Sequence, residues 1–233
     1  MSHVEEMTCE TSPVVAQVSS AQGLSAIRQP GCGAAIWHRE PPAGFQQWID
    51  TLDERQLPQA RVILRPRSVR TAVSETCEAA GTPDCPERTA LIDDISALSD
   101  AFARMMDVPY IRLRLDVVTN NMCAKFHVDG VTARLICTYR GTGTQYGVSA
   151  RGGEPDAVST APTGAPILLR GTRWPQTLPH EETARVLHRS PPIAGTGETR
   201  LLLVLDPISE CDARQQGLQP SITQSVNHPV PAS

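Results

Sequence analysis

One short segment of the sequence carries residue types that bind metal ions. It reads Cys123-Ala-Lys-Phe-His-Val-Asp129 and places a histidine and an aspartate two positions apart. Side chains alternate between the two faces of a β-strand, so a strand here puts Lys125, His127 and Asp129 on one face. An imidazole and a carboxylate on the same face can reach one metal ion, and a third ligand must then come from elsewhere in the chain.

His188 is the best candidate for the third ligand, because it lies in a short predicted strand that runs into the turn Ser190-Pro-Pro192. Two histidines and one carboxylate on one side of a metal leave three open positions, as in the facial triad of non-haem Fe(II) oxygenases. Arg200 begins the aliphatic segment Arg200–Asp206. Its guanidinium is suited to hold the far carboxylate of 2-oxoglutarate through two parallel hydrogen bonds.

Each of these residues also has a structural interpretation. His127 fits a rim histidine bonded to Asp129, His188 fits a turn histidine, and Arg200 fits a surface cation that precedes a strand. Cys123 would shift the preference of the site toward Zn(II), which thiolates favour. Strand rise places it about 13 Å from His127, so a half-buried thiol is the preferred interpretation.

Length and composition place these residues in one folded domain. The chain has 233 residues, of which 40% are hydrophobic and only 4% aromatic, so the core is expected to be aliphatic. A net charge of -4 argues against bulk electrostatic binding of nucleic acid. No aliphatic run is long enough to cross a membrane, and the acidic first residues do not resemble a secretory signal. The seven irregularly spaced cysteines are expected to be reduced thiols in a bacterial cytoplasm.

The elements that position the candidate site are predicted from hydrophobic periodicity. Residues 1–32 are expected to form a disordered arm and residues 213–233 a disordered tail. Residues 33–212 are expected to form a single domain, with a helical layer at 33–108 and a β core at 109–212. Helical patterns cover Phe45–Leu52, Val69–Cys77 and Leu91–Met105. Strand patterns cover Val62–Leu64, Tyr110–Val118, Cys123–Asp129, Ala133–Tyr139, Ile167–Arg170, Arg185–Arg189 and Arg200–Asp206.

This order of elements predicts an α+β fold that is mostly β. Helices followed by many short strands favour a sandwich or jelly roll with the helices packed outside. No helix-length segment alternates with the strands, which disfavours a parallel sheet of βαβ units.

Four segments resemble the bacterial family catalogued as domain of unknown function 1826: Lys125–Asp129, Leu135–Thr144, His188–Pro192 and Arg200–Asp206. The resemblance runs from about Ala35 to Asp206. Members are often encoded beside zinc-homeostasis genes, which implies a metal-related role.

At a wider level the chain resembles the 2-oxoglutarate/Fe(II)-dependent dioxygenase superfamily, whose fold is a cupin-like double-stranded β-helix. The resemblance implies iron ligands at His127, Asp129 and His188. It also implies that Arg200 binds the keto acid and that Asn120 lies near it. One departure is Ala165, which stands where related enzymes usually carry an aspartate.

Three functions follow as hypotheses. The first is a cytoplasmic Fe(II)/2-oxoglutarate-dependent oxygenase that acts on a small molecule or a protein. The second is a non-catalytic metal-binding module of zinc homeostasis, with Zn(II) in the same triad, and the third is a structural interaction domain. The oligomeric state is open, and no membrane contact is expected. A basic cluster at Arg61, Arg65, Arg67 and Arg70 is interpreted as a solvated edge near Asp93-Asp94 rather than a site for an anionic partner.

Overall fold

The computed structural model describes residues 13–149, 153–175 and 185–216. The helices are α1 (Phe45–Thr51), α2 (Val69–Ala79), α3 (Pro86–Met106) and α4 (Glu210–Gln215), with 3-10 turns η1 (Gln22–Arg28), η2 (Glu54–Gln56) and η3 (Pro66–Ser68). The strands are β1 (Val15–Val18), β2 (Ala34–Trp37), β3 (Ala60–Leu64), β4 (Tyr110–Val118), β5 (Ala133–Arg140), β6 (Gln145–Ser149), β7 (Ser159–Thr160), β8 (Ile167–Arg170), β9 (Arg185–Arg189) and β10 (Arg200–Ile208).

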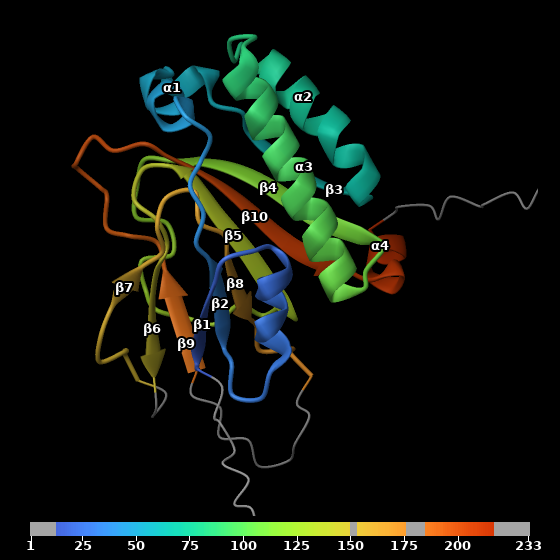
Figure 1. The fold of residues 1–233 in the computed structure, drawn as a ribbon, viewed down its shortest axis with the longest axis vertical. Coiled ribbons are helices and arrows are strands. Elements are labelled where there is room, and N and C mark those ends of the chain that lie inside the picture. Colours follow the sequence, from blue (N-terminus) through green and yellow to red (C-terminus); the bar gives the residue numbers. More distant parts are fainter. Residues whose placement is uncertain (1–12, 150–152, 176–184, 217–233) are drawn as a thin grey trace, which may run out of the picture.

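The strands form two sheets (Figure 1). The large sheet has seven strands in the order β1-β2-β8-β5-β10-β4-β3, and the small sheet has three in the order β7-β6-β9. All pairs are antiparallel except β1 with β2. From β4 onward the chain moves back and forth between the sheets, because β4, β5, β8 and β10 lie in the large sheet while β6, β7 and β9 lie in the small one. This alternation gives a mixed, mainly β, jelly-roll-like architecture.

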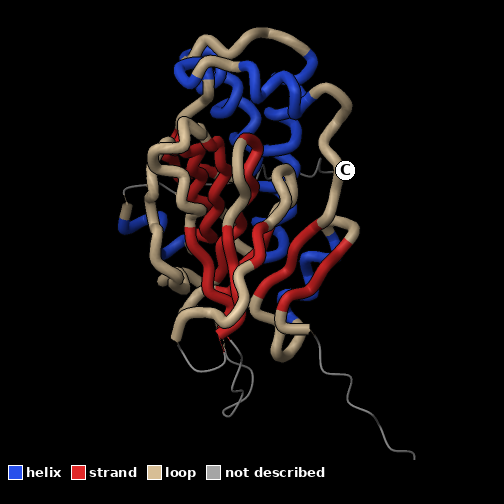
Figure 2. The backbone as a smooth tube through the Cα atoms, turned by 90° about the vertical axis from the view of Figure 1, so that its left-hand side faces the viewer, coloured by secondary structure: helices blue, strands red, loops and turns tan. Residues whose placement is uncertain are grey.

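The two faces of the large sheet have different partners. Odd-numbered residues of β10, such as Leu203, share one buried cluster with Ile95 and Phe102 of α3. Val204, an even-numbered residue of β10, belongs to a second cluster with Val186 of β9. In Figure 1, α3 accordingly lies across β4 and β10, and Figure 2 shows helices gathered at the top of the strands. The sheet therefore has a helix-covered face and a face toward the small sheet.

The sequence explains why α3 and β4 form where they do. Pro86 stands at the first turn of α3, where its missing N–H costs nothing, and Asp107 ends the helix in the left-handed conformation. Leu91, Ile95 and Leu98 are fully or almost fully buried, so one stripe of α3 packs inward. The strand β4 matches the predicted segment at both ends.

The expectation of a disordered arm over residues 1–32 is wrong for residues 13–32. β1 pairs with β2 at the edge of the large sheet, and η1 buries Leu24 and Ile27. Cys32 is also buried. This segment was missed because its few large apolar residues show neither a helical nor a strand period. Residues 1–12 lie outside the described residues.

Two further boundaries need correction. The predicted helical layer at 33–108 also contributes β2 and β3 to the large sheet. The predicted tail at 213–233 begins inside α4, where Ala213 is buried, and residues 217–233 lie outside the described part of the chain. Among the described residues, no helix combines the length and apolar character that a membrane span requires.

Candidate metal site

His127 and His188 are brought together by their backbones. The two residues form an isolated antiparallel bridge, in which each backbone N–H donates to the carbonyl of the other at 3.1 and 3.0 Å. His188 also belongs to β9, where it pairs with Tyr146 of β6. Side chains of directly opposed residues lie next to each other on one face, so this bridge sets the two imidazoles side by side.

The segment that carries His127 is not the regular strand that the sequence predicts. Apart from the bridge at His127, residues 119–130 form turns and irregular structure, and Cys123 has a positive φ of 54°. Contacts with the segment after β9 hold it in place instead. The Asn121 side chain accepts hydrogen bonds from the backbone of Ile193 and Ala194, both at 2.8 Å, and Ser190 donates to the Cys123 carbonyl.

Asp129 is fixed by the segment that follows β8. Its backbone carbonyl accepts a hydrogen bond of 2.8 Å from the Thr172 N–H. Gly171 makes this approach possible, because a Cβ at that position would lie 1.9 Å from the Val131 carbonyl oxygen. Only glycine fits here, and the close contact fixes the backbone that carries the Asp129 side chain.

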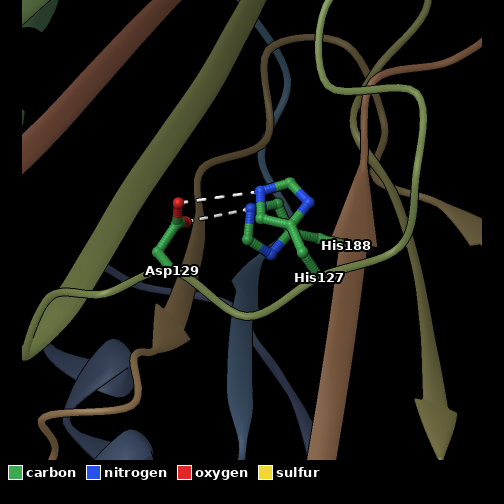
Figure 3. A group of neighbouring side chains, drawn as sticks. All are labelled: His127, Asp129 and His188. Carbon is green, nitrogen blue, oxygen red and sulfur yellow. Dashed lines mark ion pairs between the residues drawn. The ribbon is translucent and has the colours of Figure 1, made fainter. Parts of the chain in front are cut away.

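The three side chains converge (Figure 3). Asp129 faces both rings, with Oδ2 3.0 Å from Nε2 of His188 and Oδ1 3.7 Å from Nε2 of His127. One potential ligand atom from each residue lies within 4.8 Å of the other two. Two atoms bound to one ion at about 2 Å lie at most about 4 Å apart, so the three residues meet one ion after a small inward movement of their side chains. The geometric expectation that the three side chains meet at one point therefore agrees with the structure.

The hydrogen bonding and burial of the two imidazoles suit metal ligands. Nδ1 of His127 lies 2.9 Å from the Lys125 carbonyl. A carbonyl only accepts, so Nδ1 donates this hydrogen bond and Nε2 faces Asp129, as in metal sites where the second ring nitrogen donates to the backbone. Burial lowers the pKa of His188 and so favours the neutral ring, while Asp129 acts in the opposite direction.

Arg134 of β5 orients the carboxylate of Asp129. Its guanidinium donates to Oδ1 of Asp129 and forms a two-pronged ion pair with the buried Asp206, at 2.7 and 2.9 Å. Burial on its own raises the pKa of Asp129, but His188, Arg134 and His127 outweigh it and lower that pKa. Asp129 is therefore ionised at neutral pH. Sequence reasoning missed Arg134, although strand alternation in β5 would have placed it on this face.

One carboxylate oxygen of the site faces a candidate metal ligand directly. Oδ2 of Asp129 is buried and lies 3.0 Å from Nε2 of His188, with no further hydrogen-bond partner among the described residues. A cation between the carboxylate and the rings would complete the interactions of this oxygen, which is costly to bury incompletely paired. One ionised carboxylate and two imidazoles are a donor set that fits a divalent metal ion.

Arg200 lies on the same face of the large sheet and is almost completely buried, with 1% of its surface exposed. Its Nε donates to the Thr142 carbonyl at 2.6 Å, and Nη2 lies 3.5 Å from the Thr138 hydroxyl. Nη1 has no hydrogen-bond partner, and no carboxylate forms an ion pair with the guanidinium among the described residues. Burial lowers the pKa of Arg200 to about 10, with Glu198 acting in the opposite direction. The interpretation of Arg200 as a surface cation is wrong.

Two other predicted residues, Asn120 and Cys123, have exposed side chains. Asn120 is exposed, whereas its neighbour Asn121 makes the backbone contacts described above. Cys123 is also exposed, so the interpretation as a half-buried thiol is corrected, and it is absent from the cluster formed by His127, Asp129 and His188.

Comparisons with known proteins give distant structural similarities. A rice dioxygenase for auxin oxidation is 13% identical with a TM-score of 0.48, over 85% of this chain and 84% of that one. A 2OG-Fe(II) oxygenase family oxidoreductase from Burkholderia pseudomallei is 14% identical with a TM-score of 0.42, over 84% and 95%. A Pseudomonas putida prolyl-4-hydroxylase is 11% identical with a TM-score of 0.43, over 82% and 96%. TM-scores below 0.5 are too low to assign an activity.

Sequence comparisons give a clearer assignment. No curated protein matches the chain. A family model described as "Protein of unknown function (DUF1826)" matches residues 19–206, which is most of the chain and includes all three residues of the candidate site. The chain belongs to this family.

Proposed function

We propose that this protein is an Fe(II)- and 2-oxoglutarate-dependent oxygenase built on a double-stranded β-helix. The observation that carries the proposal is the convergence of His127, Asp129 and His188 on the same sheet face as the buried, incompletely paired Arg200. Two imidazoles and one carboxylate leave open positions on the metal. When bound, the iron supplies the site at which dioxygen is activated for oxidation of the substrate.

The chain contributes the geometry around the metal. The His127–His188 bridge sets the rings, and Arg134 holds Oδ1 of Asp129 while Oδ2 faces His188. Such supporting contacts orient ligands and tune metal affinity. The side chain of Arg200 is assigned to the far carboxylate of 2-oxoglutarate, which would give Nη1 its missing partner.

The spacing along β5 supports this division of roles. Arg134 contacts the metal-ligand candidate Asp129, whereas Thr138 lies next to Arg200. Four residues of strand separate Arg134 from Thr138, or about 13 Å. A five-carbon dicarboxylate and the long arginine side chain together span such a separation.

Titration with 2-oxoglutarate tests the proposal. The Fe(II)-loaded protein is kept anaerobic while 2-oxoglutarate is added, and the metal-to-ligand absorption band is recorded. We expect a saturable band in the wild type and none in His188→Ala, with succinate formed once oxygen is admitted. A metal-loaded wild type without this band contradicts the proposal.

A non-catalytic metal-binding module that uses Zn(II) is the alternative. Two imidazoles and a carboxylate are also zinc ligands, so the triad alone favours neither metal. Arg200 favours the oxygenase, because metal storage has no use for a buried guanidinium that lacks an anion. Metal binding without any affinity for 2-oxoglutarate would support the alternative.

A further inference from the structure

A second group of arginines lies on the same face of the large sheet as the candidate metal site. Leu113 and Leu115 of β4 pack in the cluster on the helix-covered face. Alternation therefore turns Arg112 and Arg114 to the other face. Arg134 lies on that face as well, two strands away, because β10 separates β4 from β5.

Arg114 lies directly opposite another arginine. In the pairing of β3 with β4, Arg61 is the partner of Arg114. Directly opposed side chains on adjacent antiparallel strands have Cβ atoms about 5 Å apart, and like charges in this arrangement destabilise the sheet. Arg61 is exposed and Arg114 is half-buried, so the pair combines an accessible cation with a partly desolvated one.

Neither arginine has a strong partner in the described part of the chain. The carboxylate nearest to Arg114 belongs to Asp116 at 3.9 Å, which is beyond hydrogen-bond distance. Nε of Arg114 is buried without a hydrogen-bond partner. Arg61 makes no hydrogen bond or ion pair with the described residues. Asp206 forms its ion pair with Arg134 and lies beyond ion-pair distance of Arg114, on which it acts only as a nearby charge.

Two other arginines of the basic cluster predicted from the sequence, Arg65 and Arg70, have different roles. Arg70 pairs with Asp93, as the interpretation of a solvated edge expects, and Arg65 lies 4.5 Å from the centre of the Tyr110 ring. Arg61 alone in this cluster opposes a second arginine across the sheet. Burial, followed by the nearby Arg134, lowers the pKa of Arg114, which is consistent with an excess of positive charge.

We propose that Arg61 and Arg114 bind an oxyanion, a carboxylate or phosphate carried by the substrate. This inference rests on the proposed function and adds a substrate class to it: an anionic organic molecule. Paired guanidinium groups offer the parallel donors that such groups accept. The register places the backbones of Arg114 and Arg134 two strands and two residues apart, or about 12 Å, and Arg134 contacts Asp129. A substrate that spans this distance would reach the metal site while the pair holds its anionic group.

Calorimetric titration of the metal-free protein with inorganic phosphate, and in parallel with acetate, tests the pair. We expect saturable binding of at least one anion, weakened at least tenfold in Arg61→Gln and in Arg114→Gln. Arg104→Gln, an exposed change on α3 at the helix-covered face, is the matched control and should bind like the wild type. Tighter binding of phosphate or of acetate indicates whether the anionic group of the substrate is a phosphate or a carboxylate. Absence of binding, or unchanged affinity in Arg61→Gln, overturns the inference.

The outcome is separable from that of the proposed function. Arg61→Gln should retain the absorption band with Fe(II) and 2-oxoglutarate, because Arg61 touches neither. A wild type that binds phosphate through Arg61 but gives no such band would refute the oxygenase and leave the anion site. An absorption band in the wild type without anion binding would support the oxygenase and refute the anion site. Arg61 is exposed, so its substitution keeps the test valid even if Arg114→Gln fails to fold.

Discussion

Replacing Arg200 with methionine tests whether the protein keeps a costly buried charge for the sake of ligand binding. The change removes the guanidinium while keeping an unbranched apolar side chain. Burial lowers the pKa of Arg200 from its ordinary value to about 10, so the folded state disfavours the charged form by about 3 kcal/mol at neutral pH. The sign is destabilising, because the unfolded chain binds this proton more tightly than the folded chain does.

Loss of the hydrogen bond to Thr142 acts in the opposite direction. Removing the donor from the partly buried Thr142 carbonyl costs about 1–3 kcal/mol. The free energy of unfolding of the metal-free Arg200→Met variant is therefore expected to be unchanged or raised by up to about 2 kcal/mol. Leu203→Ala, at a fully buried position of the same strand, is the control and should lose about 2–5 kcal/mol.

Urea denaturation at pH 7.5 measures both changes. With Fe(II) under anaerobic conditions, 2-oxoglutarate at a hundredfold excess over its Kd should stabilise the wild type by about 2.7 kcal/mol and Arg200→Met far less. A loss of stability in metal-free Arg200→Met as large as in Leu203→Ala would show that the guanidinium is a structural group. Equal stabilisation of both proteins by 2-oxoglutarate would refute its role in binding.

Three further predictions concern the site and its supports. Deletion of residues 1–33 should lower the Tm by roughly 10 °C or more in a thermal melt, because it removes β1 and buried Leu24 and Ile27; an unchanged Tm would contradict this. Arg134→Met should weaken metal binding by about 10- to 100-fold in a calorimetric titration, since Asp129 loses the group that orients it, and unchanged affinity would argue against that role. Because burial lowers the pKa of His188, the unfolded chain takes up this proton first as the pH falls, so metal-free stability should decline below about pH 6.5. Urea denaturation at pH 7.5 and 5.5 should show a smaller decline in His188→Gln, and an equal decline would count against this cause.

Periodicity predicted the regular elements well. The alternating apolar residues of Tyr110–Val118 correspond to β4 in full, and the stripe Leu91–Met105 lies within α3. In each of these segments the apolar residues keep the same spacing over several turns of helix or several residues of strand. The side chains that this spacing places on one face are the ones that are buried. β6 was missed because Gln145–Ser149 contains a glycine and few large apolar residues, and its position depends on pairing with β9.

The candidate site was predictable only in part. His127, Asp129 and His188 were identified by residue type and spacing, but the expected regular strand at Cys123–Asp129 does not form. The rings meet because of a single bridge between distant segments, and Asp129 is placed by the close approach at Gly171. Contacts of this kind depend on the tertiary fold. For the same reason, no local pattern indicated that Arg61 lies opposite Arg114.

The central claim is that His127, Asp129 and His188 hold one metal ion. Anaerobic purification in the presence of Fe(II), followed by metal analysis, tests it most directly. We predict one metal ion per chain in the wild type and in His38→Ala, a control histidine outside the site, and almost none in Asp129→Ala or His188→Ala. A wild type that binds no metal, or an Asp129→Ala variant that retains a full equivalent, would contradict the claim.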